Sequence, residues 1–253
     1  MFAGFQRKKM KNYNFWEKWK NKSKIEKRAI KLVKKARTIV TKCIPKKALF
    51  AIYIKGSFVR REMNNKSDID MVPVVTENKY EGKVFGVNGR EIFPVMVVPL
   101  SLQEFEKNEL HSKGNYSPDL RAKPDRFLRK LSEHKLICGR HLNQSKFPIR
   151  SDKELLKEKI MVIKNGYIPA YKSKKIDFIT LLKEIFWLTE AEQNARGLKF
   201  KSSFEGISNS VKNKNHIVHE AMFLRLNPPK NNKTKKEFVL KLEKYLSDLH
   251  KKP

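Results

Sequence analysis

Two short apolar segments joined through a glycine-serine turn constrain the fold of this chain more than any other feature. Residues 49–54 form an apolar and aromatic run of strand length, and residues 68–75 read as a second strand. Gly56 and Ser57 follow the first run directly. Glycine has no side chain and tolerates positive φ, so the backbone can approach another group closely there. We therefore predict a strand, a tight turn and a second strand.

Two carboxylates begin the second predicted strand. Asp68 and Asp70 lie two positions apart. Side chains alternate across a strand, so both carboxylates project from one face while Ile69 projects from the other. They can then reach one cation, and backbone amides at Gly56 and at a helix opening near Phe58 can approach an anion. This arrangement is typical of metal-assisted phosphoryl chemistry.

The stretch from Gly56 to Asp70 resembles the signature of the DNA polymerase beta superfamily of nucleotidyltransferases, especially its minimal and kanamycin-nucleotidyltransferase-like branches. The resemblance covers about residues 25 to 145. It implies Mg²⁺ (or Mn²⁺) as cofactor and an NTP as substrate. The matching positions are Gly56, Ser57, Arg60 and Ser67, which it implies bind the nucleotide, and Asp68 and Asp70, which it implies are catalytic and hold the metal.

One position departs from the family pattern. The family carries a third carboxylate on a later strand, and counting back from Ser101 and Phe105 puts Met96 at that position. A thioether is a poor ligand for a hard cation and cannot accept a proton. Glu91 and Glu62 are candidate substitutes. Two functions stay open: transfer of NMP from an NTP to a hydroxyl acceptor, or a catalytically degenerate member that acts as a nucleic-acid-binding or assembly module.

The charge of the chain indicates the class of partner. Lys and Arg number 57 against 26 Asp and Glu, which gives a formal net charge of +31 and attracts polyanions. We predict a basic N-terminal arm over residues 1–24 that binds RNA through phosphates and stacked rings, with rings packed in a hydrophobic staple as the alternative. A small-molecule or protein hydroxyl stays open as acceptor. The arm's basic residues include Arg7, Lys8, Lys9, Lys11, Lys18, Lys20, Lys22 and Lys24, interleaved with Phe2, Phe5, Tyr13, Phe15, Trp16 and Trp19.

The expected fold class is α+β. A small mixed-sheet nucleotidyltransferase domain flanked by helices spans residues 25–147, and a helical C-terminal bundle spans residues 148–253. Ser23 caps the first helix, whose apolar stripe packs on the sheet from Ile25 onward. Predicted later elements are a hairpin around Asn88-Gly89 between residues 84–87 and 90–93, a helix capped by Ser101 that runs to Glu109, a helix over 124–133 and a strand over 135–139.

Four helices are predicted for the C-terminal bundle, over residues 151–167, 176–196, 204–225 and 234–250. The family resemblance implies that such a bundle helps to form the substrate side of the cleft and often a homodimer contact. His216, His219 and Glu220 could share one helix face, but no further ligand is evident, so we interpret them as structural.

Other features bear on localisation. No apolar run approaches the roughly 18 to 20 residues that cross a bilayer, and the N-terminus lacks the apolar region of a secretory signal. Cys43 and Cys138 show neither a metal-binding spacing nor a disulfide framework. We expect a cytoplasmic protein without a membrane partner.

Overall fold

The computed structural model describes residues 10–65, 67–111 and 122–250. The chain divides into two compact units, Met1–Ile149 and Arg150–Pro253. We refer to them as the sheet unit and the helical unit.

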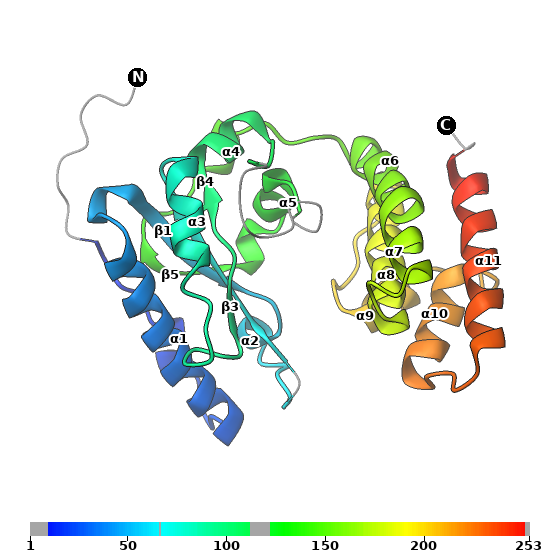
Figure 1. The fold of residues 1–253 in the computed structure, drawn as a ribbon, viewed down its shortest axis with the longest axis horizontal. Coiled ribbons are helices and arrows are strands. Elements are labelled where there is room, and N and C mark those ends of the chain that lie inside the picture. Colours follow the sequence, from blue (N-terminus) through cyan, green and yellow to red (C-terminus); the bar gives the residue numbers. More distant parts are fainter. Residues whose placement is uncertain (1–9, 66, 112–121, 251–253) are drawn as a thin grey trace. The chain divides into compact units, whose positions relative to one another are not determined.

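The sheet unit is built on a mixed sheet with strand order β3-β2-β1-β5, and β4 also pairs with β2 (Figure 1). Strand β1 is antiparallel to both β2 and β5, whereas β3 and β4 run parallel to β2. This confirms the predicted mixed sheet. The strands are β1 (Leu49–Lys55), β2 (Ile69–Val75), β3 (Val95–Val97), β4 (Leu100–Ser101) and β5 (Lys135–Gly139).

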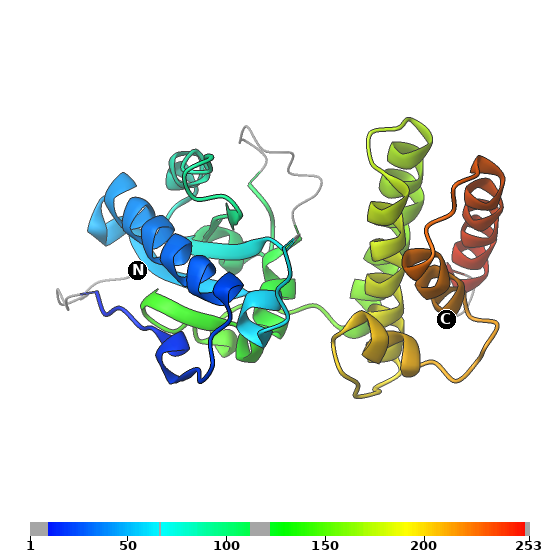
Figure 2. The ribbon, with the colours of Figure 1, turned by 90° about the horizontal axis from the view of Figure 1, so that it is seen from below.

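Helices cover both faces of this sheet (Figure 2). Helix α1 (Lys24–Cys43) packs its apolar stripe against one face, where Ile52 and Ile54 of β1 point. Helices α4 (Leu102–Lys107) and α5 (Pro124–Arg129) cover the other face, where Tyr53 points. Successive strand residues point to opposite faces, so one strand serves two cores.

Two predicted helix starts carry the capping chemistry that the sequence indicated. The Ser23 side chain accepts from the Glu26 backbone N–H, and the Glu26 carboxylate accepts from the Ser23 N–H in return. Ser101 and Glu104 form the same reciprocal pair at the start of α4. Each capping box satisfies backbone donors that a helix otherwise leaves unpaired.

The N-terminal segment does not form the predicted arm where it is described. Trp16 is only 2% exposed, and the rings of Phe15, Trp16 and Trp19 all lie against Phe58. The Tyr13 backbone N–H donates to the Ile137 carbonyl, which attaches this segment to the edge of β5. The prediction that packing starts at Ile25 is therefore wrong, because burying these rings extends the core. Residues 1–9 of the arm lie outside the described residues.

The predicted hairpin around Asn88-Gly89 is also wrong. Helix α3 (Glu81–Phe85) and a series of turns occupy this segment. The Asn88 side-chain amide donates to the carbonyls of Phe85 and Val97, and its oxygen accepts from the Val97 N–H. Asn88 therefore satisfies the backbone of β3 instead of turning between two strands.

The helical unit has a core formed by α6 (Asp152–Val162), α8 (Phe178–Ala195), α10 (Ile217–Leu226) and α11 (Asn232–His250), with Leu181, Leu182 and Ile185 of α8 fully buried. The predicted helix over 204–225 is wrong in one respect: it is two helices, and the His216 side chain caps the second one by accepting from Val218 N–H. The unit contains α6 (Asp152–Val162), the π-helical η7 (Ile163–Tyr167), α7 (Ile168–Lys172), α8 (Phe178–Ala195), α9 (Phe204–Asn209), α10 (Ile217–Leu226) and α11 (Asn232–His250).

The remaining helical segments are single turns. They are η1 (Phe15–Lys18), η2 (Lys46–Ala48), α2 (Ser57–Arg60), η3 (Asn78–Tyr80), η5 (Leu131–Glu133) and η6 (Gln144–Lys146). Among the described residues, no helix has both the length and the apolar character needed to cross a bilayer.

Candidate active site

Strand register brings three side chains together in a row across the sheet. Asp70 of β2 lies directly beside Lys55 of β1 and beside Met96 of β3. Neighbouring strands are roughly 4.8 Å apart, and residues in register point to the same face. The Lys55 Nζ lies 3.5 Å from Asp70 Oδ1. Asp70 therefore has a cation on one side and a thioether on the other.

Gly56 lies against the Asp70 carboxylate. Its φ is +80°, a conformation that disfavours any residue with a side chain. A Cβ atom at this position would lie 2.9 Å from Asp70 Oδ2. The turn after β1 thus brings the backbone of Gly56 and Ser57 into contact with the second strand. An oxyanion bound to the turn would lie next to Asp70.

The second predicted carboxylate lies just before β2. Asp68 is exposed, and it is separated from Asp70 by Ile69, which is fully buried on the α1 side of the sheet. The Ser67 hydroxyl accepts from the Asn64 backbone N–H at 3.0 Å and closes the turn that leads into Asp68. Asp70 therefore projects away from the core that Ile69 fills, and Asp68 is exposed just before the strand.

The loop that follows the turn is held by two ion pairs. Arg60 Nε donates to Glu62 Oε2 at 2.7 Å, and both side chains are exposed. Arg61 donates to the buried carboxylate of Glu26 at 2.7 Å, and its guanidinium lies over the Trp19 ring. The hydrogen bond from Arg61 lowers the pKa of Glu26 to about 2 against the opposing effect of burial. The loop is thereby fixed to α1 and to the N-terminal segment.

Met96 is the residue at the position where the family resemblance implies a third carboxylate. Its side chain shares the face of Asp70 and is 39% exposed. Glu91 pairs with Lys35 at 3.1 Å and Glu62 pairs with Arg60, and neither forms a metal-binding group with the two aspartates among the described residues. Within the described part of the chain, no three His, Cys, Asp or Glu side chains form a metal-binding group.

The residues present still fit one divalent ion. Mg²⁺ is commonly bound by one or two carboxylates, with phosphate oxygens and water completing its shell. Asp70 supplies a hard oxygen ligand beside the Gly56-Ser57 turn, and the exposed Asp68, two residues earlier, is the candidate for a second.

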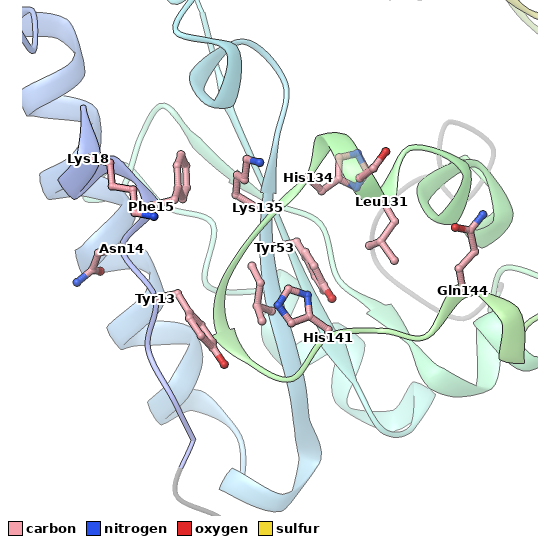
Figure 3. Close-up of a pocket in the computed structure, with 12 residues that line it drawn as sticks. Tyr13, Asn14, Phe15, Lys18, Tyr53, Leu131, His134, Lys135, His141 and Gln144 are labelled. Atoms are coloured by element: carbon pink, nitrogen blue, oxygen red, sulfur yellow. The ribbon is translucent and has the colours of Figure 1, made fainter. Parts of the chain in front are cut away.

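A hollow of about 640 Å³ lies at the β5 edge of the same unit (Figure 3). We call it the edge hollow; the residues around it include Tyr13, Lys18, His134, Lys135, His141 and Gln144. None of the described residues that line it is a carboxylate. The sequence did not indicate this feature, because segments distant in sequence form it.

His134 connects the edge hollow to the row that contains Asp70. Lys135 pairs with Ile54, so the preceding residue, His134, comes beside Lys55. Burial, together with the positive charges of Lys55 and Lys130, lowers the pKa of His134 to about 3. Its Nδ1 atom is buried without a hydrogen-bond partner among the described residues.

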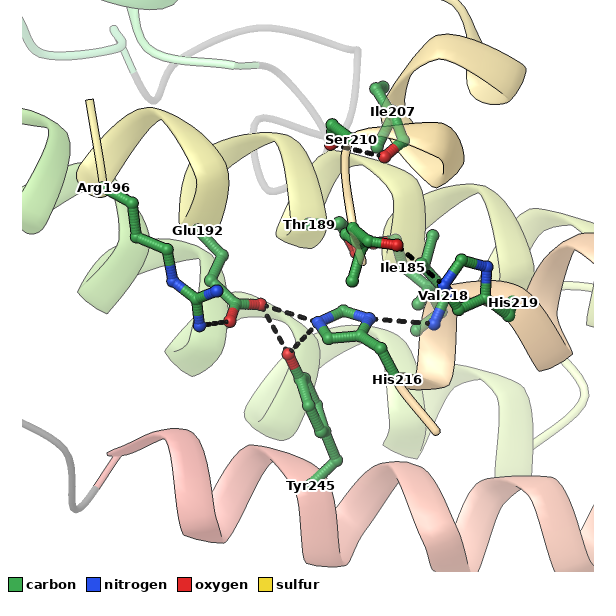
Figure 4. Close-up of polar contacts among 11 residues, drawn as sticks. Ile185, Thr189, Glu192, Arg196, Ile207, Ser210, His216, Val218, His219 and Tyr245 are labelled. Atoms are coloured by element: carbon green, nitrogen blue, oxygen red, sulfur yellow. Dashed lines mark hydrogen bonds and ion pairs between the residues drawn. The ribbon is translucent and has the colours of Figure 1, made fainter. Parts of the chain in front are cut away.

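The histidines of the helical unit take separate partners (Figure 4). His216 Nδ1 accepts from the Val218 N–H, so the neutral ring carries its proton on Nε2, which lies 3.0 Å from Glu192 Oε2. His219 instead lies 3.3 Å from the Ser208 hydroxyl. Glu220, the third residue of the predicted group, pairs with Lys241.

Glu192 is the centre of a buried network in this unit. Tyr245 on α11 and Arg196, the residue after α8, also donate to its carboxylate, in addition to His216. Burial alone would raise the pKa of Glu192, but the hydrogen bonds from His216 and Tyr245 lower it below its usual value. Burial and the adjacent carboxylate raise the pKa of Tyr245. The network links α8, α10 and α11, and its donors occupy the Glu192 carboxylate.

No protein-family model matches the chain, and no curated protein sequence matches it. Among solved structures, it is similar to a crystal structure of spectinomycin adenyltransferase AAD(9) from Enterococcus faecialis with ATP and spectinomycin. The TM-score is 0.53 at 14% identity, over 87% of this chain and 98% of that chain. At this identity the likeness shows the fold alone: the chain has a nucleotidyltransferase fold followed by a helical region.

Proposed function

We propose that this protein is a metal-dependent nucleotidyltransferase that moves NMP from an NTP to a hydroxyl acceptor, with RNA as the favoured acceptor. One observation carries the proposal. The Gly56 backbone, at positive φ, lies against the Asp70 carboxylate, so the turn and the carboxylate can act on the same phosphate group.

The residues of the turn bind the triphosphate in this proposal. The Gly56 and Ser57 amides and the Ser57 hydroxyl contact its outer phosphates. Arg60 is held only by an exposed pair with Glu62, and such pairs contribute little free energy, so its guanidinium can exchange to a phosphate oxygen. Ser67 acts by closing the turn that directs Asp68.

Asp68 and Asp70 would hold the metal. Bound Mg²⁺ would neutralise the charge that develops on the leaving pyrophosphate. The acceptor hydroxyl attacks the α-phosphorus, the bond to pyrophosphate breaks, and the hydroxyl proton passes to water. Met96 cannot take that proton, so the reaction proceeds without the family's carboxylate base. Lys55 adds a positive charge 3.5 Å from Asp70.

The structural neighbour supports an NTP as substrate, because that adenyltransferase was crystallised with ATP. It was also crystallised with spectinomycin, so a small-molecule hydroxyl is the alternative acceptor to test. The formal net charge of +31 favours a polyanion over a small molecule.

A second candidate function rests on Met96. The thioether lies in register with Asp70 where the family places a carboxylate. A protein that bound nucleotide or nucleic acid without catalysing transfer would also retain the turn residues. This candidate predicts NTP binding without any labelled product.

The test compares the wild-type protein with the double variant Asp68→Asn and Asp70→Asn. Each α-labelled NTP is incubated with Mg²⁺ or Mn²⁺ and with RNA, a panel of aminocyclitol and sugar hydroxyls, or protein extract. We expect labelled acceptor with the wild type and a loss on the order of 10²-fold or more with the variant. Calorimetry with NTP and Mg²⁺ runs in parallel. Equal metal-dependent NTP affinity of the two proteins would exclude this site.

A further inference from the structure

We propose that the edge hollow binds a nucleotide unit of single-stranded RNA through its unpaired lysines and its rings. As a binding site, the hollow is independent of catalysis. Only the view that the bound RNA is the acceptor rests on the proposed function.

The charge of the edge hollow selects an anion. Lys18 and Lys135 are exposed on its rim, and neither has an ion-pair partner among the described residues. Since no carboxylate lines the hollow within the described part of the chain, these charges stay uncompensated. Lysines are effective phosphate ligands, and neutralising phosphates releases the counterions that screen them.

The rings of the edge hollow select a flat, unpaired group. The Tyr13 and His141 ring centroids are 6.3 Å apart with an interplanar angle of 55°. The backbone of Tyr13 is fixed to β5 by its N–H bond to the Ile137 carbonyl, so the residue is held at the hollow before any ligand arrives. Bases of a duplex are stacked on each other, whereas bases of a single strand are free to stack on such rings.

Size and polar groups agree with this ligand. A hollow of about 640 Å³ lies within the range of small-molecule sites, which run from roughly 300 to 1,000 Å³. Gln144 places an amide group on its lining, and such a group can hydrogen-bond the edge of a base.

The position of the edge hollow favours RNA over a free nucleotide. His134 lies between the hollow and Lys55, which contacts Asp70. A bound strand can therefore continue along the row toward the proposed transfer site, whereas a free nucleotide would fill the hollow alone. The charge of the chain provides the surrounding attraction for a longer polyanion.

The experiment measures binding of a labelled twelve-nucleotide uridine oligomer to the full chain without NTP, by fluorescence anisotropy at several salt concentrations. The double variant Lys18→Glu and Lys135→Glu is compared with Lys46→Glu and Lys47→Glu. The latter pair makes the same change of charge on exposed lysines before β1, at the strand end opposite Lys55. We expect a loss of at least about 10-fold for the first pair and a log–log salt slope shallower by about 1.4, from roughly 0.7 per phosphate contact. Equal losses for both pairs would overturn the site.

Removal of the ring tests the base contact. We expect Tyr13→Ala to weaken binding of the uridine oligomer by about 5-fold or more. Binding of an abasic phosphodiester of equal length should not change. The control is Phe223→Ala, an exposed ring in the helical unit. An unchanged affinity after Tyr13→Ala, or displacement of the oligomer by equimolar uridine monophosphate, would overturn an RNA site. The variant Asp68→Asn with Asp70→Asn should keep the oligomer affinity, so this inference and the proposed function can fail separately.

Discussion

Asp70 in the sheet unit and Glu192 in the helical unit are both carboxylates on regular elements, but their surroundings differ. The Asp70 side chain is 34% exposed, and it forms a loose ion pair with Lys55 at 3.5 Å. Glu192 is 3% exposed and accepts hydrogen bonds from Arg196, His216 and Tyr245. The Asp70 carboxylate can therefore accept a ligand, whereas the Glu192 carboxylate is already occupied by its three donors.

The difference separates a candidate site from a structural network within one molecule. A buried, saturated carboxylate stabilises the packing of the helices that supply its donors, and it cannot accept a metal or substrate without losing them. A half-exposed carboxylate beside a positive-φ glycine adds little to folding but can bind cations. The histidines near Glu192 are therefore structural, and the aspartates near Gly56 are the better functional candidates.

The largest expected effect is on the stability of the helical unit. Glu192→Ala leaves His216 and Tyr245 without their shared acceptor in a buried site, and removing one partner of a buried pair costs about 3–5 kcal/mol. Urea unfolding followed by circular dichroism measures the change in the free energy of unfolding. Glu243→Ala, which removes an exposed pair with Lys172, is the control and should cost under about 1 kcal/mol. A similar cost for both variants would contradict the comparison.

The next effect concerns the missing carboxylate. Met96→Asp places a third carboxylate beside Asp70 on an exposed part of the sheet, where it can bind the metal and accept a proton. General base catalysis contributes on the order of 10²-fold, so the transfer rate should rise by about that factor. Met161→Asp, on an exposed position of α6, is the control. Transfer that falls or stays absent in Met96→Asp would favour the binding-module alternative.

Gly56→Ala tests the close approach in the turn. The new Cβ would meet Asp70 Oδ2 at 2.9 Å and would also require an alanine at φ +80°. We expect a loss of about 10-fold in Mg²⁺-dependent NTP affinity and about 1–2 kcal/mol in stability, because either the turn or Asp70 must move. Gly82→Ala is the matched control, since a Cβ atom at Gly82 would meet no neighbour within 4 Å. Equal NTP binding by both variants would remove Gly56 from the site.

Local sequence signals predicted much of the fold and the centre of the site. Apolar runs within residues 49–54 and 68–75 predicted the two central strands, β1 and β2, and Ser23 and Ser101 marked helix starts through capping chemistry. The spacing of Asp68 and Asp70 predicted a shared face. Strand register cannot be deduced from local pattern alone, although the family spacing did predict the position of Met96, which the register places beside Asp70.

The errors came from tertiary contacts. The rings of Trp16 and Trp19 alternate with lysines, as RNA-binding rings do, yet they pack on Phe58, which lies beyond β1 in the chain. Asn88 precedes a glycine, as in a hairpin turn, but its amide serves the backbone of β3. No local sequence pattern predicted that Lys55 and His134 lie side by side, because only the pairing of β1 with β5 brings them together.

The smallest expected effect is a pH dependence of the free energy of unfolding that comes from His134. This residue lines the edge hollow and lies beside Lys55. Its pKa is about 3 in the folded protein and near 6.5 when exposed, so the unfolded chain takes up a proton first as the pH falls. Stability that is complete above about pH 6.5 should therefore decline toward pH 4. Partial exposure of this side chain limits the difference between pH 7 and pH 5 to about 1 kcal/mol.

His134→Gln is uncharged at every pH and should flatten the stability profile between pH 7 and pH 5. Thermal unfolding at intervals of pH measures it. Glu26→Gln is the comparison: the folded pKa of Glu26 is also lowered, to about 2 from 4.5, so its contribution is lost only below about pH 4.5. Between pH 7 and pH 5, only the His134→Gln profile should differ in slope from the wild type. If the His134→Gln profile matches the wild type above pH 5, the ring is solvated in the folded protein. Water then reaches the edge hollow beside His134.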